Sequence, residues 1–157
     1  MPGKIEGRSG DGPAQVSMNR AREDVLRSLN ELFAEEVEAS LRYLHLAVTL
    51  KGLDRLLVRK TLLDGLQETI EHAQTIADKI VQLGGYPKLD LKIELPPEKT
   101  TGADAIRTAL AFEQAALDAY KELLEKLTGD DDITEFIRSQ VAVETEHVAE
   151  LTLLLEE

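Results

Sequence analysis

The residues that could carry chemistry in this chain are three glutamates and two histidines set among regularly spaced apolar residues. Glu36, Glu113 and Glu144 each interrupt an apolar stripe, and His72 and His147 lie beside such stripes. A buried carboxylate without a partner costs several kcal/mol, and a cation held in common offsets that cost. One residue of this kind would be explained by ordinary packing. Five of them, spread along the chain, predict a metal site in the protein interior.

The spacing of these residues indicates how many metal ions the site holds. Glu144 and His147 are three residues apart, which places both side chains on one helix face. Bundles that hold two irons use one Glu from each of two helices and a Glu-x-x-His pair from each of the other two. The expected cofactor is therefore dinuclear iron, with manganese or zinc as alternatives.

The two halves of the chain repeat one pattern. Tyr43 follows Glu36 by seven residues, and Tyr120 follows Glu113 by seven; His72 follows Glu36 by 36, and His147 follows Glu113 by 34. This repetition predicts one helical hairpin used twice around a pseudo-two-fold site. Tyr43 and Tyr120 are candidate catalytic residues, and the alternative is that they only close the core.

Four long helices are expected to position these residues. Apolar positions recur at steps of three and four, which is the spacing of a buried helix face. The predicted helices cover residues 19–50, 54–83, 101–127 and from 132 to near the C-terminus, the last with Asp132 and Glu135 as a capping box. Short turns join the first two helices and the last two, so each pair should form an antiparallel hairpin.

A long connection between the second and third helices sets the topology. Residues 84–100 include three prolines and could extend to ~55 Å, whereas a 30-residue helix is ~45 Å long. The connection can therefore run the length of the bundle and make these two helices parallel. The expected fold is all-α, a four-helix bundle with one long crossover.

Composition limits the function classes. The 157 residues contain 18 Lys and Arg against 30 Asp and Glu, a net charge of −12 that makes nucleic acid an unlikely partner. The absence of cysteine excludes thiolate metal sites and disulfides. No apolar run has the length of a membrane span and no signal peptide is recognised, so a cytoplasmic protein without a membrane partner is expected.

The chain is expected to divide into a flexible tail, residues 1–18, and a bundle, residues 19–157. The first 16 residues contain four Gly and two Pro. Residues 5–8, Ile-Glu-Gly-Arg, resemble a protease-site linker, so the tail is interpreted as partly vector-derived or as natural.

The sequence resembles the ferritin-like superfamily, and the bacterioferritins most closely within it. The resemblance covers residues 19–157. It is carried by Leu29-Asn30-Glu31-Leu32 with Glu36, by Glu71-His72-Ala73, by Leu110-Ala111-Phe112-Glu113 and by Glu144-Thr145-Glu146-His147. It implies terminal metal ligands at Glu36, Glu113, His72 and His147, and a bridging carboxylate at Glu144. It also implies that a tyrosine near the site supplies a hydrogen bond or an electron.

Two positions depart from the pattern that the resemblance implies. Thr69 stands where the second bridging glutamate is expected; Glu68 next to it, or water, would have to fill that place. A working dimetal site, a single-metal site and a vestigial site all remain open. Ile70 stands where bacterioferritins hold haem with Met, so no haem is expected.

The chain ends ten residues after His147, without the fifth helix of bacterioferritins. A dimer or a smaller shell is therefore expected as the homo-oligomer rather than a 24-subunit shell.

The predicted function is iron binding with ferroxidase activity: Fe2+ oxidised by O2 or peroxide for iron storage or detoxification. The alternatives are a peroxidase, catalase or oxygenase of the same fold, and a non-catalytic shell or interaction protein with a degenerate site. Among the remaining candidates, His45 is expected at a surface or interface, and Glu35, Glu38, Glu71 and Glu146 are expected on solvated helix faces.

Overall fold

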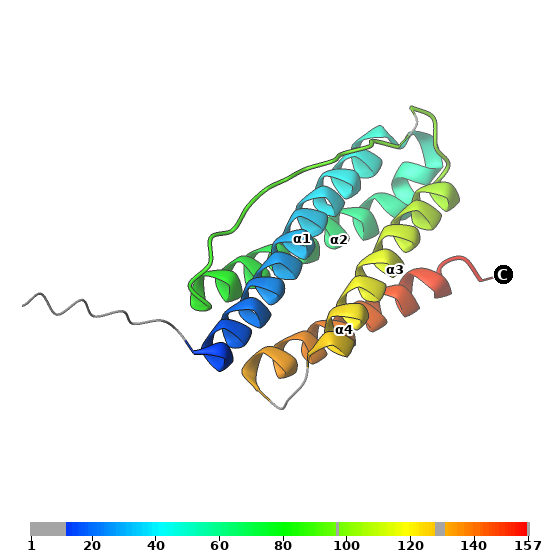
Figure 1. Ribbon diagram of the computed structural model, residues 1–157. Coiled ribbons are helices and arrows are strands. Elements are labelled where there is room, and N and C mark those ends of the chain that lie inside the picture. The colour runs from blue at the N-terminus through cyan, green and yellow to red at the C-terminus, as the bar shows by residue number, and fades with distance from the viewer. Residues whose placement is uncertain (1–11, 97, 128–130, 157) are drawn as a thin grey trace, which may run out of the picture.

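The computed structural model describes residues 12–96, 98–127 and 131–156, and its four helices form an all-α bundle. The helices are α1 (Pro13–Thr49), α2 (Gly52–Gln82), α3 (Gly102–Lys126) and α4 (Asp132–Leu153). In Figure 1, α1 and α2 form one antiparallel hairpin and α3 and α4 form the other. The predicted four-helix bundle is confirmed; α2 and α3 begin and end within two residues of the expected positions, and α4 begins at the expected residue.

The first helix begins earlier than predicted. Helix α1 starts at Pro13, which occupies the first helical turn, where a proline loses no hydrogen bond. Residues 13–22 are exposed and have no apolar stripe, so periodicity could not place them in a helix. The expected boundary between tail and bundle, at residue 18, thus falls inside α1, and residues 1–11 lie outside the described part of the chain.

Side-chain caps start the second hairpin. The hydroxyl oxygen of Thr101 accepts a hydrogen bond from the backbone N–H of Asp104 at the start of α3. At α4 the cap is Asp131, which accepts from the N–H of Thr134 at 2.9 Å. The prediction of a capping box at Asp132 was therefore wrong by one residue, because Asp132 is already helical.

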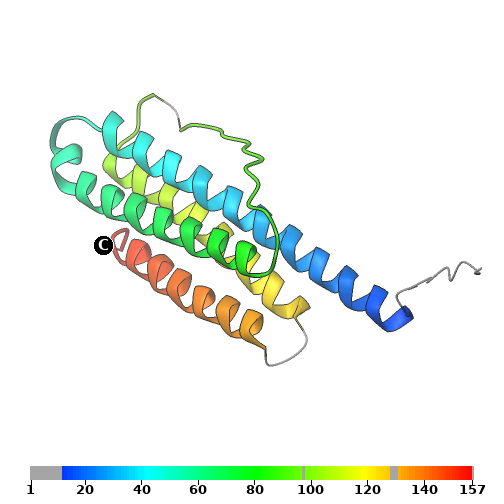
Figure 2. The ribbon, with the colours of Figure 1, turned by 90° about the vertical axis from the view of Figure 1, so that its left-hand side faces the viewer.

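The connection between α2 and α3 runs along the bundle, as its length predicted (Figures 1 and 2). Gly84 turns the chain out of α2 with a φ of 76°, a conformation that favours glycine. The backbone N–H of Lys88 then donates to Asn30 at 2.6 Å, and that of Lys92 donates to Glu38 at 2.5 Å. These contacts hold the crossover against α1 and leave α2 and α3 parallel.

Two apolar clusters fill the bundle and leave its middle for polar residues. One cluster includes Leu50, Leu62 and Leu151 near the α1–α2 turn, and the other includes Leu29 and Ile137 near the opposite end. Each helix passes from one cluster to the other. The glutamates and histidines singled out for chemistry fall between the clusters on all four helices, and Tyr43 and Tyr120 belong to one cluster each.

None of the described helices contains a stretch long and apolar enough to cross a membrane.

Candidate metal centre

Three carboxylates from three helices meet in the middle of the bundle. Glu36 on α1, Glu113 on α3 and Glu144 on α4 are all buried, and Glu144 has 0% of its surface exposed. Each sits at a stripe position that an apolar side chain would normally occupy, which is why the helix packing carries it inward. The structure therefore brings the predicted acids together in the interior, where water does not screen their charges.

Two tyrosines hold two of these carboxylates across the bundle. The hydroxyl of Tyr43 on α1 donates to Glu113 on α3 at 2.5 Å, and that of Tyr120 on α3 donates to Glu36 on α1 at 2.9 Å. Both rings are buried. The exchange is reciprocal, as expected for a hairpin used twice, and it fixes the orientation of Glu36 and Glu113.

Gly65 on α2 makes room for one of these tyrosines. A Cβ at this position would lie 2.6 Å from the ring of Tyr43, closer than real side chains approach. Glycine lets the backbone of α2 pack directly on the ring. This close approach holds the hydroxyl of Tyr43 at Glu113.

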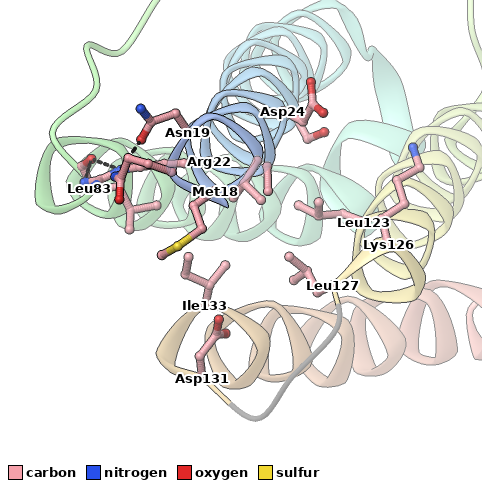
Figure 3. Close-up of a pocket in the computed structure, with 14 residues that line it drawn as sticks. Met18, Asn19, Arg22, Asp24, Leu83, Leu123, Lys126, Leu127, Asp131 and Ile133 are labelled. Atoms are coloured by element: carbon pink, nitrogen blue, oxygen red, sulfur yellow. Dashed lines mark hydrogen bonds between the residues drawn. The ribbon is translucent and has the colours of Figure 1, made fainter. Parts of the chain in front are cut away.

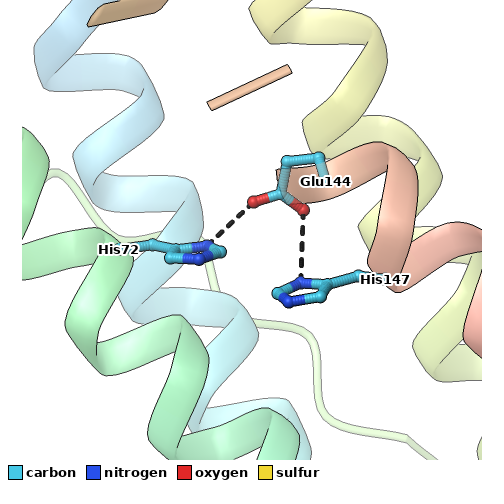
Figure 4. A group of neighbouring side chains, drawn as sticks. All are labelled: His72, Glu144 and His147. Carbon is cyan, nitrogen blue, oxygen red and sulfur yellow. Dashed lines mark ion pairs between the residues drawn. The ribbon is translucent and has the colours of Figure 1, made fainter. Parts of the chain in front are cut away.

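Each of the two histidines faces one oxygen of Glu144 (Figure 4). Nδ1 of His72 lies 2.8 Å from Oε1 of Glu144, and Nδ1 of His147 lies 3.9 Å from Oε2 of the same side chain. The imidazole rings are stacked, with centroids 5.2 Å apart and planes at 7°. His72 also lies 3.9 Å from Glu36 and His147 lies 4.0 Å from Glu113, so each histidine has its own terminal carboxylate.

Glu144 lacks the hydrogen bonds that a buried carboxylate requires. Neither of its oxygens accepts a hydrogen bond of regular geometry, although His72 lies within ion-pair distance. One ligand atom from each of His72, Glu144 and His147 lies within 4.8 Å of the others. An orphaned buried carboxylate between two imidazoles is a donor set that fits a divalent cation such as iron.

The clustering of acids raises their pKa values in the metal-free protein. Burial and then the charge of Glu144 raise the pKa of Glu36 to about 8 and that of Glu113 to about 9, from an ordinary value of 4.5. Burial works against a charged His72, but the adjacent Glu144 and Glu36 outweigh it and raise its pKa. Protons therefore occupy the place that a cation would take when metal is bound.

Thr69 stands at the position where the resemblance implies a second bridging carboxylate, and its hydroxyl is already used in a hydrogen bond. Thr69 is buried and donates its hydroxyl proton to the carbonyl of Gly65 at 2.7 Å. Glu68 is half-exposed, and its Oε2 lies 3.4 Å from Nε2 of His147. The structure thus places Glu68 beside one histidine at the edge of the centre rather than between the two.

A surface hollow leads from the α2–α4 face to the centre. No Cα of α2 lies within 8 Å of a Cα of α4 among the described residues, so these helices leave a hollow of about 430 Å³. The hollow reaches Tyr43, Gly65 and His147, and three carboxylates line it: Asp64, Glu68 and Glu150. A smaller hollow of about 220 Å³ borders Glu36 and Glu113 on the α1–α3 face.

A larger hollow lies at the other end of the bundle (Figure 3). It has a volume of about 680 Å³ and is lined by seven apolar and seven polar residues, with Met18, Leu83 and Ile133 among the apolar ones. Arg22 at its edge is bound to the carbonyl of Leu83. It contains none of the carboxylates or histidines of the centre, so volume alone does not identify the functional site.

The prediction for Glu38 was wrong. Glu38 was expected on a solvated face, but it is buried, where it accepts from Arg42 at 3.0 Å and from the N–H of Lys92. The signal available in the sequence was Arg42 four residues later on the same helix face.

His45 is partly buried, and its Nε2 is enclosed without a hydrogen-bond partner.

Comparisons with known proteins agree with this architecture. A solved structure described as ferritin-like, diiron-carboxylate proteins from Bacillus anthracis strain Ames has 25% identity and a TM-score of 0.75, and the match covers 87% of this chain and 98% of that one. A dodecameric thioferritin, the bacterioferritin-related protein of Bacteroides fragilis, has 26% identity and a TM-score of 0.75, with 83% of each chain covered.

A search of curated proteins gives no match. The family model of the ferritin-like domain matches residues 26–157, which include α1 from residue 26 on, the other three helices and the centre between them. This match covers most of the chain, and the chain belongs to the ferritin-like domain family.

Proposed function

We propose that this protein is a ferroxidase that binds Fe2+ at the intra-bundle centre and oxidises it for iron storage or detoxification. The observation that carries the proposal is Glu144, a fully buried carboxylate that accepts no hydrogen bond of regular geometry and faces two stacked histidines, one with each oxygen. The ligands would be Glu36, His72, Glu113, Glu144 and His147, with Glu68 at the edge.

The side chains of the centre have distinct parts in this chemistry. The three carboxylates offset the charge of the incoming cations, and the imidazoles supply neutral donors. Tyr43 and Tyr120 orient Glu113 and Glu36 through their hydrogen bonds. In the overall reaction two Fe2+ lose one electron each, and one O2 takes both electrons and two protons to become H2O2.

The hollow between α2 and α4 supports a cation rather than an apolar substrate. Asp64, Glu68 and Glu150 line it together with leucines, and it ends at His147. Carboxylates concentrate cations in a cleft, whereas they disfavour a hydrocarbon. This arrangement favours iron oxidation over the oxygenase alternative. The dodecameric relative supports a homo-oligomer as the working form.

Anaerobic titration with Fe2+, followed by O2, tests the proposal. We expect two Fe2+ per chain to bind and to be oxidised rapidly, and we expect both properties to be lost in Glu113→Ala. Glu146→Ala is the matched control, because Glu146 is exposed on α4. Absence of stoichiometric binding by the wild-type protein would exclude the proposal.

Thr69→Glu is expected to increase iron affinity. The substitution places a carboxylate three residues before His72, on the same helix face, where the two-metal pattern has its second bridge. We expect about tenfold tighter binding, which corresponds to about 1.4 kcal/mol. Thr69→Gln, of the same size but without the charge, should give a smaller gain. Unchanged affinity would indicate that Glu68 already fills this place, and Glu68→Ala would then weaken binding.

A further inference from the structure

The two nitrogens of the His147 ring face different acids. Nδ1 lies 3.9 Å from Oε2 of Glu144 and 4.0 Å from Oε2 of Glu113, the buried carboxylates of the centre. Nε2 lies 3.4 Å from Oε2 of Glu68, and Figure 4 shows this nitrogen turned away from Glu144. Glu68 on α2 therefore meets His147 on α4 at the ring nitrogen that does not face the centre.

This arrangement gives Glu68 a part that differs from that of the buried acids. A neutral imidazole carries one proton, so a histidine that offers Nδ1 to a metal has its proton on Nε2. Nε2–H is then a donor, and Oε2 of Glu68 is an acceptor within reach of it. Histidines that bind metals usually donate this second N–H to a carboxylate or a carbonyl, which fixes the ring and makes it a stronger ligand.

His72 lacks a partner of this kind. Its Nδ1 lies 2.8 Å from Oε1 of Glu144. Beyond the two buried acids that face Nδ1, no carboxylate among the described residues lies within 4.0 Å of its ring nitrogens.

The repeat in the sequence explains the difference between the histidines. Glu68 stands four residues before His72, and Val143 stands four residues before His147. In the pseudo-two-fold pattern, Val143 is therefore the counterpart of Glu68, and a valine side chain accepts no hydrogen bond. The second half of the chain lacks the acid that the first half supplies.

We propose that Glu68 is a positioning residue of the metal centre and not a ligand: it accepts a hydrogen bond from Nε2–H of His147 and so keeps Nδ1 free for the metal. The inference rests on the proposed function, because that function gives His147 its part in the centre. It makes the two metal positions unequal. The position at His147 has a histidine held through its second nitrogen and binds the first cation, whereas the position at His72 binds the second.

A crystal structure of the Zn2+-loaded wild-type protein tests the role of Glu68 directly. Zn2+ is the probe because it does not change oxidation state and binds imidazole nitrogen at about 2.0–2.1 Å. We expect Zn2+ on Nδ1 of His147, and Glu68 within hydrogen-bond distance of Nε2. Zn2+ between Nε2 and Glu68, or bound to an oxygen of Glu68, would make this side chain a ligand and overturn the proposal.

Zn2+ titration calorimetry tests whether Glu68 acts through one histidine. Loss of a carboxylate behind a metal-binding histidine typically weakens binding about 10–100-fold. We expect a loss of this size in Glu68→Ala for the tighter of two Zn2+ ions only, and a partial recovery in Glu68→Gln, whose amide oxygen still accepts a hydrogen bond. The side chain is 51% exposed, so its truncation leaves no cavity in the core. Glu71→Ala is the control, because it removes an exposed acid from the same helix.

An equal loss for both ions, or a loss that Glu68→Gln does not reduce, would show that Glu68 acts only through its charge at the hollow, and would overturn the proposal. A wild-type protein that binds no Zn2+ would do the same, because Glu68 would then orient no ligand. These outcomes are independent of iron oxidation. A protein that binds Zn2+ through Nδ1 of His147 but does not oxidise Fe2+ would keep the positioning role and exclude the ferroxidase. A protein that oxidises Fe2+ but has Glu68 bound to the metal would do the reverse.

Discussion

Replacing Glu144 with leucine is expected to abolish iron binding and, in the same protein, to stabilise the metal-free bundle. Glu144 is fully buried and accepts no hydrogen bond of regular geometry, with His72 2.8 Å away as its nearest partner, so the metal-free protein bears the desolvation of a carboxylate without full compensation. Replacing a whole buried ion pair with packed apolar residues of similar size is often neutral or stabilising by about 1–4 kcal/mol, and here His72, the partner left behind, can lose its proton and need not stay charged. Without Glu144, however, the protein lacks the carboxylate that faces both histidines, so we expect iron not to bind.

The opposite signs of the two effects distinguish a functional carboxylate from a structural one. We expect chemical denaturation of the metal-free Glu144→Leu variant to give a higher free energy of unfolding than the wild type, and anaerobic Fe2+ titration to show no stoichiometric binding. Glu146→Leu, on the exposed face of the same helix, should change neither property appreciably. A Glu144→Leu variant that is less stable than wild type would mean that Glu144 holds the bundle together, and would contradict the interpretation.

The substitution should also change its neighbours. The charge of Glu144 raises the pKa of both Glu36 and Glu113, and its proximity raises the pKa of His72. Its removal is therefore expected to lower all three pKa values. Glu144→Gln separates the effect of the charge from the effect of a polar side chain at this place, because it removes the charge and keeps the polar side chain.

Sequence periodicity predicts most of the fold because each helix buries a continuous stripe. Glu36, Glu113 and Glu144 stand out in these stripes since an acid in an apolar row is costly. The same reasoning fails for residues 13–18 of α1, which are helical but exposed and bury no stripe. It also fails for Glu38, whose burial depends on the crossover lying over α1.

The tyrosines show what sequence spacing cannot supply. Tyr43 follows Glu36 by two helical turns, or about 10 Å along the axis, too far for a hydrogen bond within the helix. The structure instead pairs Tyr43 with Glu113 and Tyr120 with Glu36. This crosswise pairing depends on how α1 packs against α3. The repeat in the sequence predicted the symmetry of the site but not its partners.

The metal-free protein is expected to lose stability as the pH rises from about 5 to about 9. The pKa of Glu36 is raised to about 8 and that of Glu113 to about 9, so the folded state holds protons that the unfolded state has released. Stability from a raised pKa is complete below the unfolded value and is lost as the pH rises through the folded value. His72, whose pKa is also raised, acts in the same direction. One raised group changes stability by up to about 1.4 kcal/mol per pH unit, so the total loss should be several kcal/mol.

Iron reverses this dependence, because ligation requires the deprotonated carboxylates. Affinity for Fe2+ should rise with pH over the range in which the metal-free protein weakens, and binding should release protons. Denaturation in the presence of a chelator measures how the stability of the metal-free protein depends on pH. Anaerobic calorimetry in two buffers of different ionisation enthalpy counts the protons that iron binding releases. Glu36→Gln/Glu113→Gln is the control: its metal-free stability should vary much less with pH, because the two carboxyls whose pKa is raised to about 8 and about 9 are gone. A wild-type protein whose metal-free form becomes more stable toward alkaline pH would show that these two carboxyls are ionised without metal, and that the centre does not exchange protons for iron.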